Sequence, residues 1–468
     1  MKKNTFAVII GNRGFFPDEL AEQGRKNILD TLTKLKYNAV CLSTKNTKSG
    51  AVESYDDAVK CAALFKKNAD KIDGIIVSLP NFGDEKGVAN AIRMSGLDVP
   101  VLIQAEPDDP KTMKIQSRRD SFCGKISVCN NLRQYGIPFT LTQFHTESVS
   151  SDVFSEDVNY FAAVCRVVKG LKSVRIGAIG ARPAAFNTVR YSEKILEREG
   201  IAVETIDLSE IFGMCDKLSA KDKSVVKKLK EITGYINCSG VPKSALTKMA
   251  KFGVIVDNWM EKNGLNVTAI QCWTSMEEFL GVSPCTIMSM MSNKLIPSAC
   301  EVDVCGALSM YAMTLASGTP SALADWNNNY GDDLDKCVLF HCSNLPKKMF
   351  KEVKMGYQEI LAQTLCKTNT YGTCTGRIKK GDFTFTRITT DDTDGIIRAY
   401  TGEGEMTDDP LNTFGGYGVA EIPDLPILLD YICTEGFEHH VAINYSESSE
   451  AIAEAFNNYL GWETYLHI

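Results

Sequence analysis

The sequence of 468 residues predicts an α/β protein: two consecutive α/β domains with parallel sheets, followed by a β-rich C-terminal domain. Short apolar or β-branched runs alternate with amphipathic stretches up to about residue 168, and the same alternation restarts near Gly170. After about residue 345, short Thr-rich runs separated by Gly and Asp replace this alternation. We therefore expect domains over residues 1–168, 169–344 and 345–468.

The first domain is expected to contain a parallel sheet, because continuous apolar runs between helices are typical of strands buried on both faces. The predicted strands cover residues 6–10, 39–42, 74–79, 99–104 and 139–144. Amphipathic helices are predicted over residues 19–35 and 55–69.

The second and third domains differ in the order of their predicted strands and helices. In the second, strands are predicted over residues 174–179, 203–208 and 234–238, with a helix over 188–198 that ends before Gly200. In the third, a helix is predicted over residues 347–366, then strands over 372–378, 383–388, 396–400 and 441–444 and a last helix over 449–460.

Composition excludes several functional classes. The net charge of -7 argues against a nucleic-acid partner, which needs a concentrated basic surface. No run of 18 apolar residues is present, so no membrane-spanning helix is expected, and the apolar start reads as a first strand rather than a signal peptide. The glycine patterns of nucleotide-binding loops and the GxSxG nucleophile turn are absent, so no nucleotide cofactor is expected.

The 16 cysteines are scattered and form no CxxC pair. They are interpreted as buried free thiols in a reducing cytoplasm, which is where we expect the protein to reside. A disulfide framework or an iron–sulfur site is the alternative.

Two carboxylates are candidates for chemistry. Glu301 precedes a small, apolar stretch over residues 305–313, and a glutamate that enters a buried helix is costly unless it is paired or binds a metal. The alternative is an ordinary carboxylate at a helix N-terminus. Asp325 ends a short apolar run, a good position for entering a cleft, although a turn aspartate would have the same pattern.

Adjacent histidines, His439 and His440, precede an apolar run and are expected at the start of a strand. Because neighbouring strand residues face opposite ways, one imidazole can enter a site while the other braces it, and a surface pair is the alternative. His341 ends another apolar run, where a core histidine is the alternative to a ligand. Carboxylates with imidazole suit Mn or Mg better than structural zinc.

Together these segments resemble the L-fucose isomerase / L-arabinose isomerase superfamily over essentially the whole chain. The motifs that carry the resemblance are residues 299–303 with 306–310, the Asp325 segment, residues 436–440, the stretch 271–274 and the turn around Arg13. The chain is shorter than typical L-fucose isomerases, and Gly14 follows Arg13 where the family usually has proline. In these departures the chain resembles the branch of the superfamily that acts on sulfoquinovose.

The resemblance implies a set of site residues. Glu301, Asp325 and His440 match the metal ligands, and the two carboxylates also match the acid–base pair. Arg13, Gln271, His341 and His439 match positions that contact substrate, and His341 also matches a further imidazole ligand in the arabinose branch.

The implied function is a metal-dependent aldose–ketose isomerase that acts through a cis-enediol on L-fucose, D-arabinose or a sulfoquinovose-like sugar. The implied cofactor is a divalent metal, Mn before Mg or Co. Two other functions remain open: a non-catalytic sugar-binding or sensing protein, and a metal-dependent epimerase or lyase. The family also implies a homo-oligomer, a trimer or hexamer, in which Arg13 completes a neighbouring subunit's site.

Overall fold

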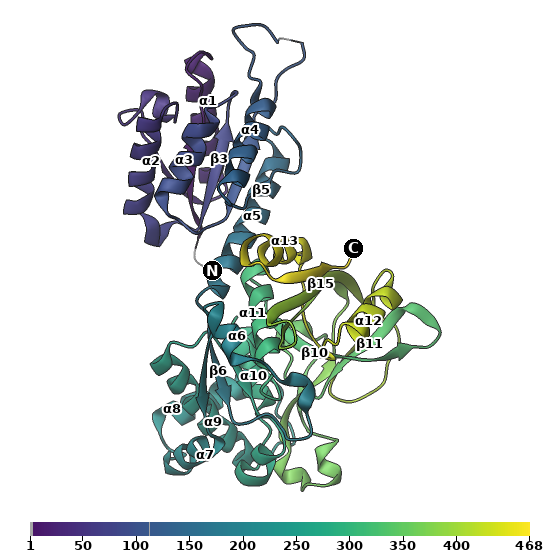
Figure 1. The fold of residues 1–468 in the computed structure, drawn as a ribbon. Coiled ribbons are helices and arrows are strands. Elements are labelled where there is room, and N and C mark those ends of the chain that lie inside the picture. Colours follow the sequence, from purple (N-terminus) through teal and green to yellow (C-terminus); the bar gives the residue numbers. More distant parts are fainter. Residues whose placement is uncertain (1–2, 112) are drawn as a thin grey trace. The chain divides into compact units, whose positions relative to one another are not determined.

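The computed structural model describes residues 3–111 and 113–468 (Figure 1). The chain divides into two compact units, one running to Lys169 and including Asn458–Gly461, the other comprising Gly170–Asn457 and Trp462–Ile468. Each unit is described by itself.

The first unit is built on a five-stranded parallel sheet with strand order β2-β1-β3-β4-β5. The strands are β1 Thr5–Ile10, β2 Asn38–Cys41, β3 Gly74–Leu79, β4 Val101–Ala105 and β5 Thr140–Leu141. The helices are α1 Asp18–Lys34, α2 Tyr55–Lys67, α3 Glu85–Ser95, α4 Ser121–Gln134 and α5 Asp152–Leu171.

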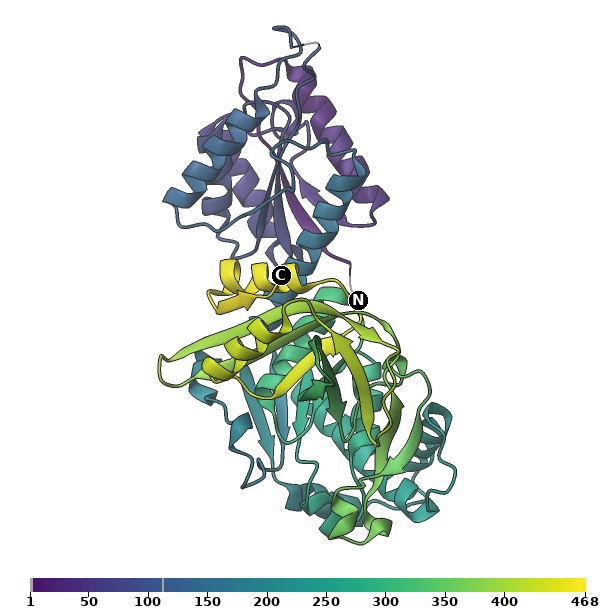
Figure 2. The ribbon, with the colours of Figure 1, turned by 90° about the vertical axis from the view of Figure 1, so that its right-hand side faces the viewer.

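Helices cover both faces of this sheet (Figure 2). Side chains of α1 and α5 pack with Phe6, Val8 and Ile10 of β1, whereas α2, α3 and α4 pack with Ala7 and Ile9 of the same strand. Burial on both faces explains why the strands are continuous apolar runs, as the sequence indicated.

The second unit begins with a four-stranded parallel sheet of order β7-β6-β8-β9. The strands are β6 Arg175–Ile179, β7 Ala202–Ile206, β8 Val267–Ile270 and β9 Ser298–Ala299. The helices are α6 Glu193–Arg198, α7 Leu208–Lys217, α8 Lys223–Tyr235, α9 Lys243–Asn263, α10 Cys285–Asn293 and α11 Val304–Ser317.

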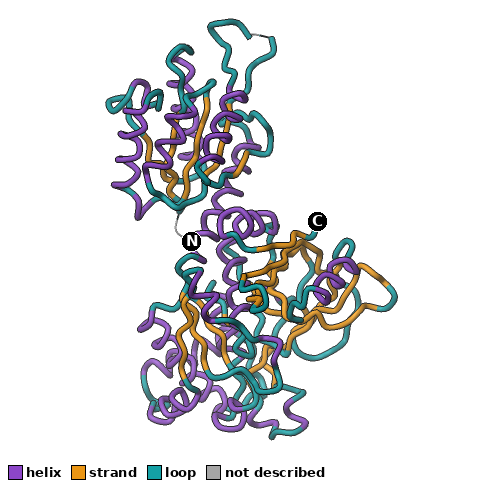
Figure 3. The backbone as a smooth tube through the Cα atoms, viewed as in Figure 1, coloured by secondary structure: helices purple, strands orange, loops and turns teal. Residues whose placement is uncertain are grey.

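A mixed, β-rich sheet of nine strands follows (Figure 3). The strands are β10 Ser321–Tyr330, β11 Asp333–His341, β12 Lys354–Tyr357, β13 Tyr371–Arg377, β14 Gly381–Asp391, β15 Ile396–Thr407, β16 Gly416–Glu421, β17 His440–Asn444 and β18 Glu463–Leu466. The helices α12 Leu425–Thr434 and α13 Ser449–Glu454 accompany them. An additional β15–β16 pairing closes six of the strands into a ring.

The predicted fold class is confirmed: two parallel α/β sheets are followed by a β-rich sheet. The hairpin β10–β11, which precedes residue 345 in the chain, pairs with β17 and β16 and so belongs to the nine-stranded sheet. Among the described residues, no helix has both the length and the apolar character needed to cross a membrane.

Two predicted elements do not form, and the helix predicted over residues 188–198 begins only at Glu193. Residues 234–238 do not form a strand: α8 continues to Tyr235, and only Asn237 makes an isolated bridge, with Lys354. Residues 347–366 do not form one helix, because Lys354–Tyr357 is strand β12, paired with β13. The pairing needs close approach at Gly356, where a Cβ atom would lie 2.7 Å from Oγ1 of Thr375. Tertiary pairing here outweighs local helix propensity.

Candidate active site

The predicted carboxylates and two of the predicted histidines converge in the second unit. Glu301 lies between β9 and α11, and Asp325 lies within β10, so the turn alternative for Asp325 is wrong. β10 pairs with β17 in a register that places Asp325 directly opposite His440. His341 is the last residue of β11, the strand on the other side of β10. The sheet pairing therefore brings residues from distant parts of the sequence together.

One carboxylate oxygen of Glu301 is hydrogen-bonded, and the other has no hydrogen-bond partner among the described residues. Its Oε1 accepts a hydrogen bond from Nε1 of Trp273 at 2.9 Å and from the thiol of Cys272 at 3.4 Å. Its Oε2 is buried and has no hydrogen-bond partner among the described residues. An ionised oxygen left in this state is costly unless a cation or substrate group satisfies it.

The backbone at Glu301 is also unusual. Glu301 has φ of 55° and Val302 has φ of 57°, in the left-handed region that β-branched residues rarely enter. Each such residue costs of the order of 1–3 kcal/mol, and such conformations persist where the surroundings fix them, often at functional sites. α11 begins directly after this turn, with Asp303 as its N-cap.

Imidazole nitrogens surround the open oxygen. Nε2 of His440 lies 3.7 Å from Oε2 of Glu301, and Nε2 of His341 lies 3.8 Å from the same atom. Nε2 of His440 is also 3.5 Å from Oδ1 of Asp325. Both imidazoles are almost fully buried, whereas the carboxylate of Asp325 is 21% exposed. His440 therefore lies between the two carboxylates, and His341 lies beside Glu301.

The tautomer of His440 is set by Asp303. Nδ1 of His440 donates a hydrogen bond to Oδ2 of Asp303 at 2.8 Å, so Nε2 keeps its lone pair for the site. Burial alone would lower the pKa of His440, but the hydrogen bond and charge of Asp303, with the carboxylates of Glu301 and Asp325, raise it above its ordinary value.

Asp303 belongs to a fully buried ionic network. The guanidinium of Arg387 forms a bidentate contact with Asp303, and its Nε and Nη2 atoms bond Glu438 at 3.0 and 2.9 Å. Burial opposes ionisation of Asp303, but Arg387 and His440 hold its pKa well below its usual range. A negative charge therefore stays behind His440 at any physiological pH.

His439 occupies the rim of the site. Its side chain is 42% exposed, and its Nε2 lies 3.9 Å from Oδ1 of Asp325. Partial burial and the neighbouring His440 lower its pKa, so it is neutral near pH 7. A neutral imidazole at the mouth of a cavity can donate to or accept from a hydroxyl group.

The arrangement fits a divalent metal. Glu301, His341 and His440 bring their ligand atoms within 4.8 Å of one another, and so do Asp325, His439 and His440. The unpartnered Oε2 of Glu301 and the free Nε2 of His440 both face this cluster. Mixed carboxylate and imidazole ligands suit a divalent cation.

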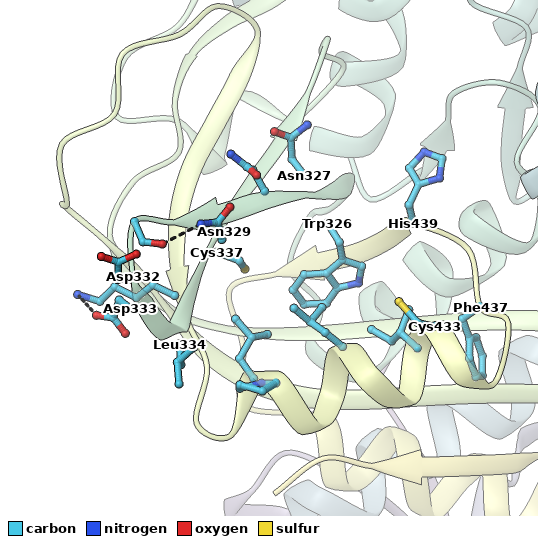
Figure 4. Close-up of a pocket in the computed structure, with 17 residues that line it drawn as sticks. Trp326, Asn327, Asn329, Asp332, Asp333, Leu334, Cys337, Cys433, Phe437 and His439 are labelled. Atoms are coloured by element: carbon cyan, nitrogen blue, oxygen red, sulfur yellow. Dashed lines mark hydrogen bonds and ion pairs between the residues drawn. The ribbon is translucent and has the colours of Figure 1, made fainter.

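The cluster lines a cavity of about 280 Å³. Aromatic and aliphatic side chains form much of its wall, namely Phe186, Trp273, Phe340, Ile360 and Leu361, with Cys342 and Gln358 beside them. A second cavity of about 800 Å³ lies between the hairpin β10–β11 and α12, with Trp326 on its wall (Figure 4). His439 lines both cavities.

Two predicted substrate residues make other contacts. The side chain of Gln271 accepts a hydrogen bond from the backbone of Ala181 at 2.9 Å and donates to Ser275 at 3.3 Å, and it is not among the residues that line the cavity. Arg13 belongs to the first unit, where it donates to the carbonyls of Phe82 and Gly83. Their roles in substrate binding stay predictions.

Sequence reasoning assigned no role to Asp303, Arg387 or Glu438. Asp303 and Glu438 lie inside the motifs that carried the family resemblance, two residues from metal-ligand positions. Arg387 was detectable as a charged residue in an otherwise apolar and Thr-rich strand, where an unpaired arginine would be unstable.

Comparison with protein families agrees with this geometry. Residues 7–172 match the model described as fucose/sulfoquinovose isomerase, N-terminal domain, and residues 339–467 match that of L-fucose isomerase, C-terminal domain. Together the two matches cover more than half of the chain.

The chain is also similar to curated proteins named sulfoquinovose isomerase. The protein from Priestia aryabhattai is 24% identical over 347 residues, which is 73% of each chain. The protein from Alkalicoccus urumqiensis is 24% identical over 390 residues, 82% of this chain and 83% of the relative. The chain therefore belongs to the fucose/sulfoquinovose isomerase family and is a sugar aldose–ketose isomerase.

Proposed function

We propose that the protein interconverts an aldose of the sulfoquinovose type with its 2-ketose. The names of the relatives, which align with up to 82% of this chain, support a sulfonated sugar over L-fucose or D-arabinose. The observation that carries the chemistry is the buried, unpartnered Oε2 of Glu301 beside the Nε2 atoms of His341 and His440.

The acid–base work is assigned to the two carboxylates. Trp273 and Cys272 fix Oε1 of Glu301, which lines the cavity, so Oε2 is left for the chemistry. One carboxylate, Glu301 or Asp325, removes the proton from C2 of the open-chain aldose, and a cis-enediol forms. The protonated acid returns that proton to C1, while the hydroxyl proton passes from O2 to O1. The proton transfer depends on how the carboxylates are positioned beside the sugar, and it uses no redox cofactor.

The metal would be held by Glu301, Asp325 and His440, with His341 as a further imidazole. When bound, a divalent cation such as Mn stabilises the negative charge that develops on the sugar oxygens. Asp303 fixes the ring of His440 for this role, and the apolar wall around Phe186 and Trp273 excludes water.

A sulfonate needs a cationic partner, and the cavity does not offer one from its own unit. Among the described residues that line it, the only groups that can become positive are imidazoles. We propose that Arg13 of a neighbouring subunit supplies a guanidinium, whose remaining nitrogen, Nη1, donates hydrogen bonds to such an anion. This requires a homo-oligomer, and a trimer or hexamer is the proposed state.

The test is isomerisation in heavy water. The protein is loaded with Mn and incubated separately with sulfoquinovose, L-fucose and D-arabinose, and the products are analysed by NMR. We expect a 2-ketose from sulfoquinovose with deuterium at C1 whenever the transferred proton exchanges with solvent. A C2 epimer or a cleavage product would support the epimerase or lyase alternative, and binding without turnover of any sugar would support a sugar sensor.

A further inference from the structure

Thiols gather on the side of Glu301 that faces away from the imidazoles. Cys272 follows β8, Cys285 starts α10 and Cys300 follows β9, and all three are buried. Cys300 contacts both Cys272 and Cys285, and Cys272 donates to Oε1 of Glu301. The proposed isomerisation requires only one of these thiols, and only as a hydrogen-bond donor.

The spacing of three of these groups matches a metal coordination shell. Sγ of Cys272, Sγ of Cys300 and a carboxylate oxygen of Glu301 lie within 4.8 Å of one another, and the Cys272–Glu301 contact is 3.4 Å. In a tetrahedral site with metal–sulfur bonds of about 2.3 Å and metal–oxygen bonds of about 2.0–2.2 Å, neighbouring ligand atoms are about 3.5–3.8 Å apart. The three ligand atoms therefore need only small shifts to share one cation.

The chemistry of this group differs from that of the cluster across the carboxylate. Thiolates are soft ligands, whereas the carboxylates and imidazoles of Glu301, Asp325, His341 and His440 are harder ligands that suit a harder divalent cation. Glu301 stands between the two: Oε1 faces the thiols and Oε2 faces the imidazoles. Glu301 and Cys342 line the cavity, which gives a cation a route to the thiol side.

We propose that Cys272, Cys300 and Oε1 of Glu301 form a second metal site, which takes a thiophilic divalent cation such as Zn²⁺ or Cd²⁺. Two thiols each release a proton when the cation binds, so two thiolates and one carboxylate surround a charge of +2. The cation replaces Trp273 as the partner of Oε1. It thereby competes with the catalytic cluster for the carboxylate of Glu301. Given the proposed function, occupancy of this site inhibits the isomerase.

The test uses Cd²⁺, because thiolate-to-cadmium charge transfer gives an ultraviolet absorption band that oxygen and nitrogen ligands do not give. The exposed cysteines would bind Cd²⁺ as well, so the starting protein is the full chain with Cys123, Cys366 and Cys433 replaced by serine. After chelation and dialysis it is titrated with Cd²⁺. We expect the band to saturate at one equivalent.

Three variants in that background locate the site. Cys272→Ser and Cys300→Ser should each lose most of the band, whereas Cys215→Ser, which removes an equally buried thiol elsewhere in the unit, should keep it. Asp325→Asn should also keep it, because Asp325 belongs only to the other cluster. Circular dichroism checks that each variant is folded, and Cys272→Ala and Cys300→Ala replace any serine variant that is not.

The outcomes separate this proposal from the proposed isomerisation. A parent protein without the band, or a band unchanged in both the Cys272 and Cys300 variants, would overturn the thiol site whatever the activity. If the band behaves as expected, Zn²⁺ should inhibit the Mn-loaded enzyme, and Cys272→Ser should raise the inhibiting concentration at least about tenfold. If the protein shows the band but isomerises none of the sugars, the proposal of a thiol site stands and the proposed function is wrong.

Discussion

Asp303 accepts a hydrogen bond from Nδ1 of His440 over 2.8 Å, and this contact determines which nitrogen of the histidine faces the candidate metal cluster. The carboxylate stays ionised because Arg387 contacts it through two guanidinium nitrogens. A carboxylate behind a metal-binding histidine orients the ring and raises its basicity. The buried network is therefore part of the site although none of its charges enters the cavity.

Asp303→Asn should weaken Mn binding by about 10–100-fold, the usual effect of removing such a contact. The amide can no longer accept from Nδ1–H as a charged group, so the ring loses its orientation. The measurement is the Mn dissociation constant by calorimetry at pH 7.5.

Glu438→Gln is the matched control for that variant. Glu438 also pairs with Arg387 in the buried network, but its carboxylate bonds Arg387 and Thr389 rather than His440. Both variants should lower the melting temperature, because each leaves the buried Arg387 with one carboxylate fewer. Only Asp303→Asn should lower metal affinity strongly. Equal losses of affinity in the two variants would show that the network acts through stability alone.

Glu301→Gln should reduce turnover at least about a hundredfold, the scale expected when an acid–base group is removed. The substitution preserves the shape of the side chain but removes the charge of the open Oε2, which faces two imidazoles. Turnover is measured with the best substrate of the sugar panel at saturating Mn. Near-wild-type turnover would exclude Glu301 from the chemistry.

Glu277→Gln provides the control for loss of a buried glutamate in the same unit. Glu277 lies in the turn Met276–Leu280 and accepts a hydrogen bond from Ser283 at 2.7 Å. Burial raises its pKa to about 8, so its carboxyl group is neutral at pH 7 and an amide replaces it with little change. This variant should keep near-wild-type turnover at pH 7.

The same residue predicts a pH dependence of stability. Because the folded-state pKa of Glu277 lies above its ordinary value of 4.5, the folded protein binds this proton more tightly than the unfolded chain. Its contribution is complete below pH 4.5 and is lost as the pH rises through about 8. At about 1.4 kcal/mol per pKa unit, this proton contributes at most about 5 kcal/mol to the free energy of unfolding.

Glu277→Gln should remove this dependence. Melting temperatures of the wild type and the variant are compared at pH 6 and pH 9 by differential scanning fluorimetry. Relative to the wild type, the variant should gain stability between the two pH values. A constant difference between the two proteins would show that Glu277 does not titrate in this range.

The fold was predictable wherever strands are buried on both faces. The expected strand over residues 74–79 coincides with β3, and the helix over 55–69 differs from α2 only at its end. The expectation failed over residues 347–366, where local helix propensity competes with long-range pairing between β12 and β13. No local pattern reports a partner strand that lies later in the chain.

The residues of the candidate cluster were predictable from the sequence, and the residues that support them were not. Glu301, Asp325 and His440 were found because carboxylates and histidines stand out beside apolar runs and match a known motif. The role of Arg387 depends on a contact with Asp303 across 84 positions of sequence, and that contact becomes visible only when β14 pairs with β17. The thiols around Cys300 come together in the same way, from the ends of separate elements.

Arg13 leads to the last prediction, which concerns assembly. Within its own unit, Nε of Arg13 donates to Phe82 at 2.8 Å, while Nη2 donates to Gly83 at 3.0 Å and pairs with Glu85. Among the described residues, Nη1 has no hydrogen-bond partner, and the guanidinium lies 4.3 Å from the ring of Phe82. The group is therefore held in place with one nitrogen left for an anion such as a sulfonate.

If Arg13 completes the site of a neighbouring subunit, two inactive variants should restore each other. Arg13→Ala and Glu301→Gln are each expected to lose activity, but a mixed oligomer contains sites that combine an intact Arg13 from one subunit with an intact Glu301 from another.

Subunits are mixed by co-expression with different affinity tags, and doubly tagged oligomers are assayed. For a cyclic trimer, about one third of the wild-type activity per oligomer is the ceiling, since each mixed ring has one intact site among its three. A mixture of Asp325→Asn and Glu301→Gln is the control: both changes disable the cluster within one subunit, so every mixed oligomer should stay inactive. Activity in the control mixture, or none in the Arg13 mixture, would place Arg13 outside the neighbouring site.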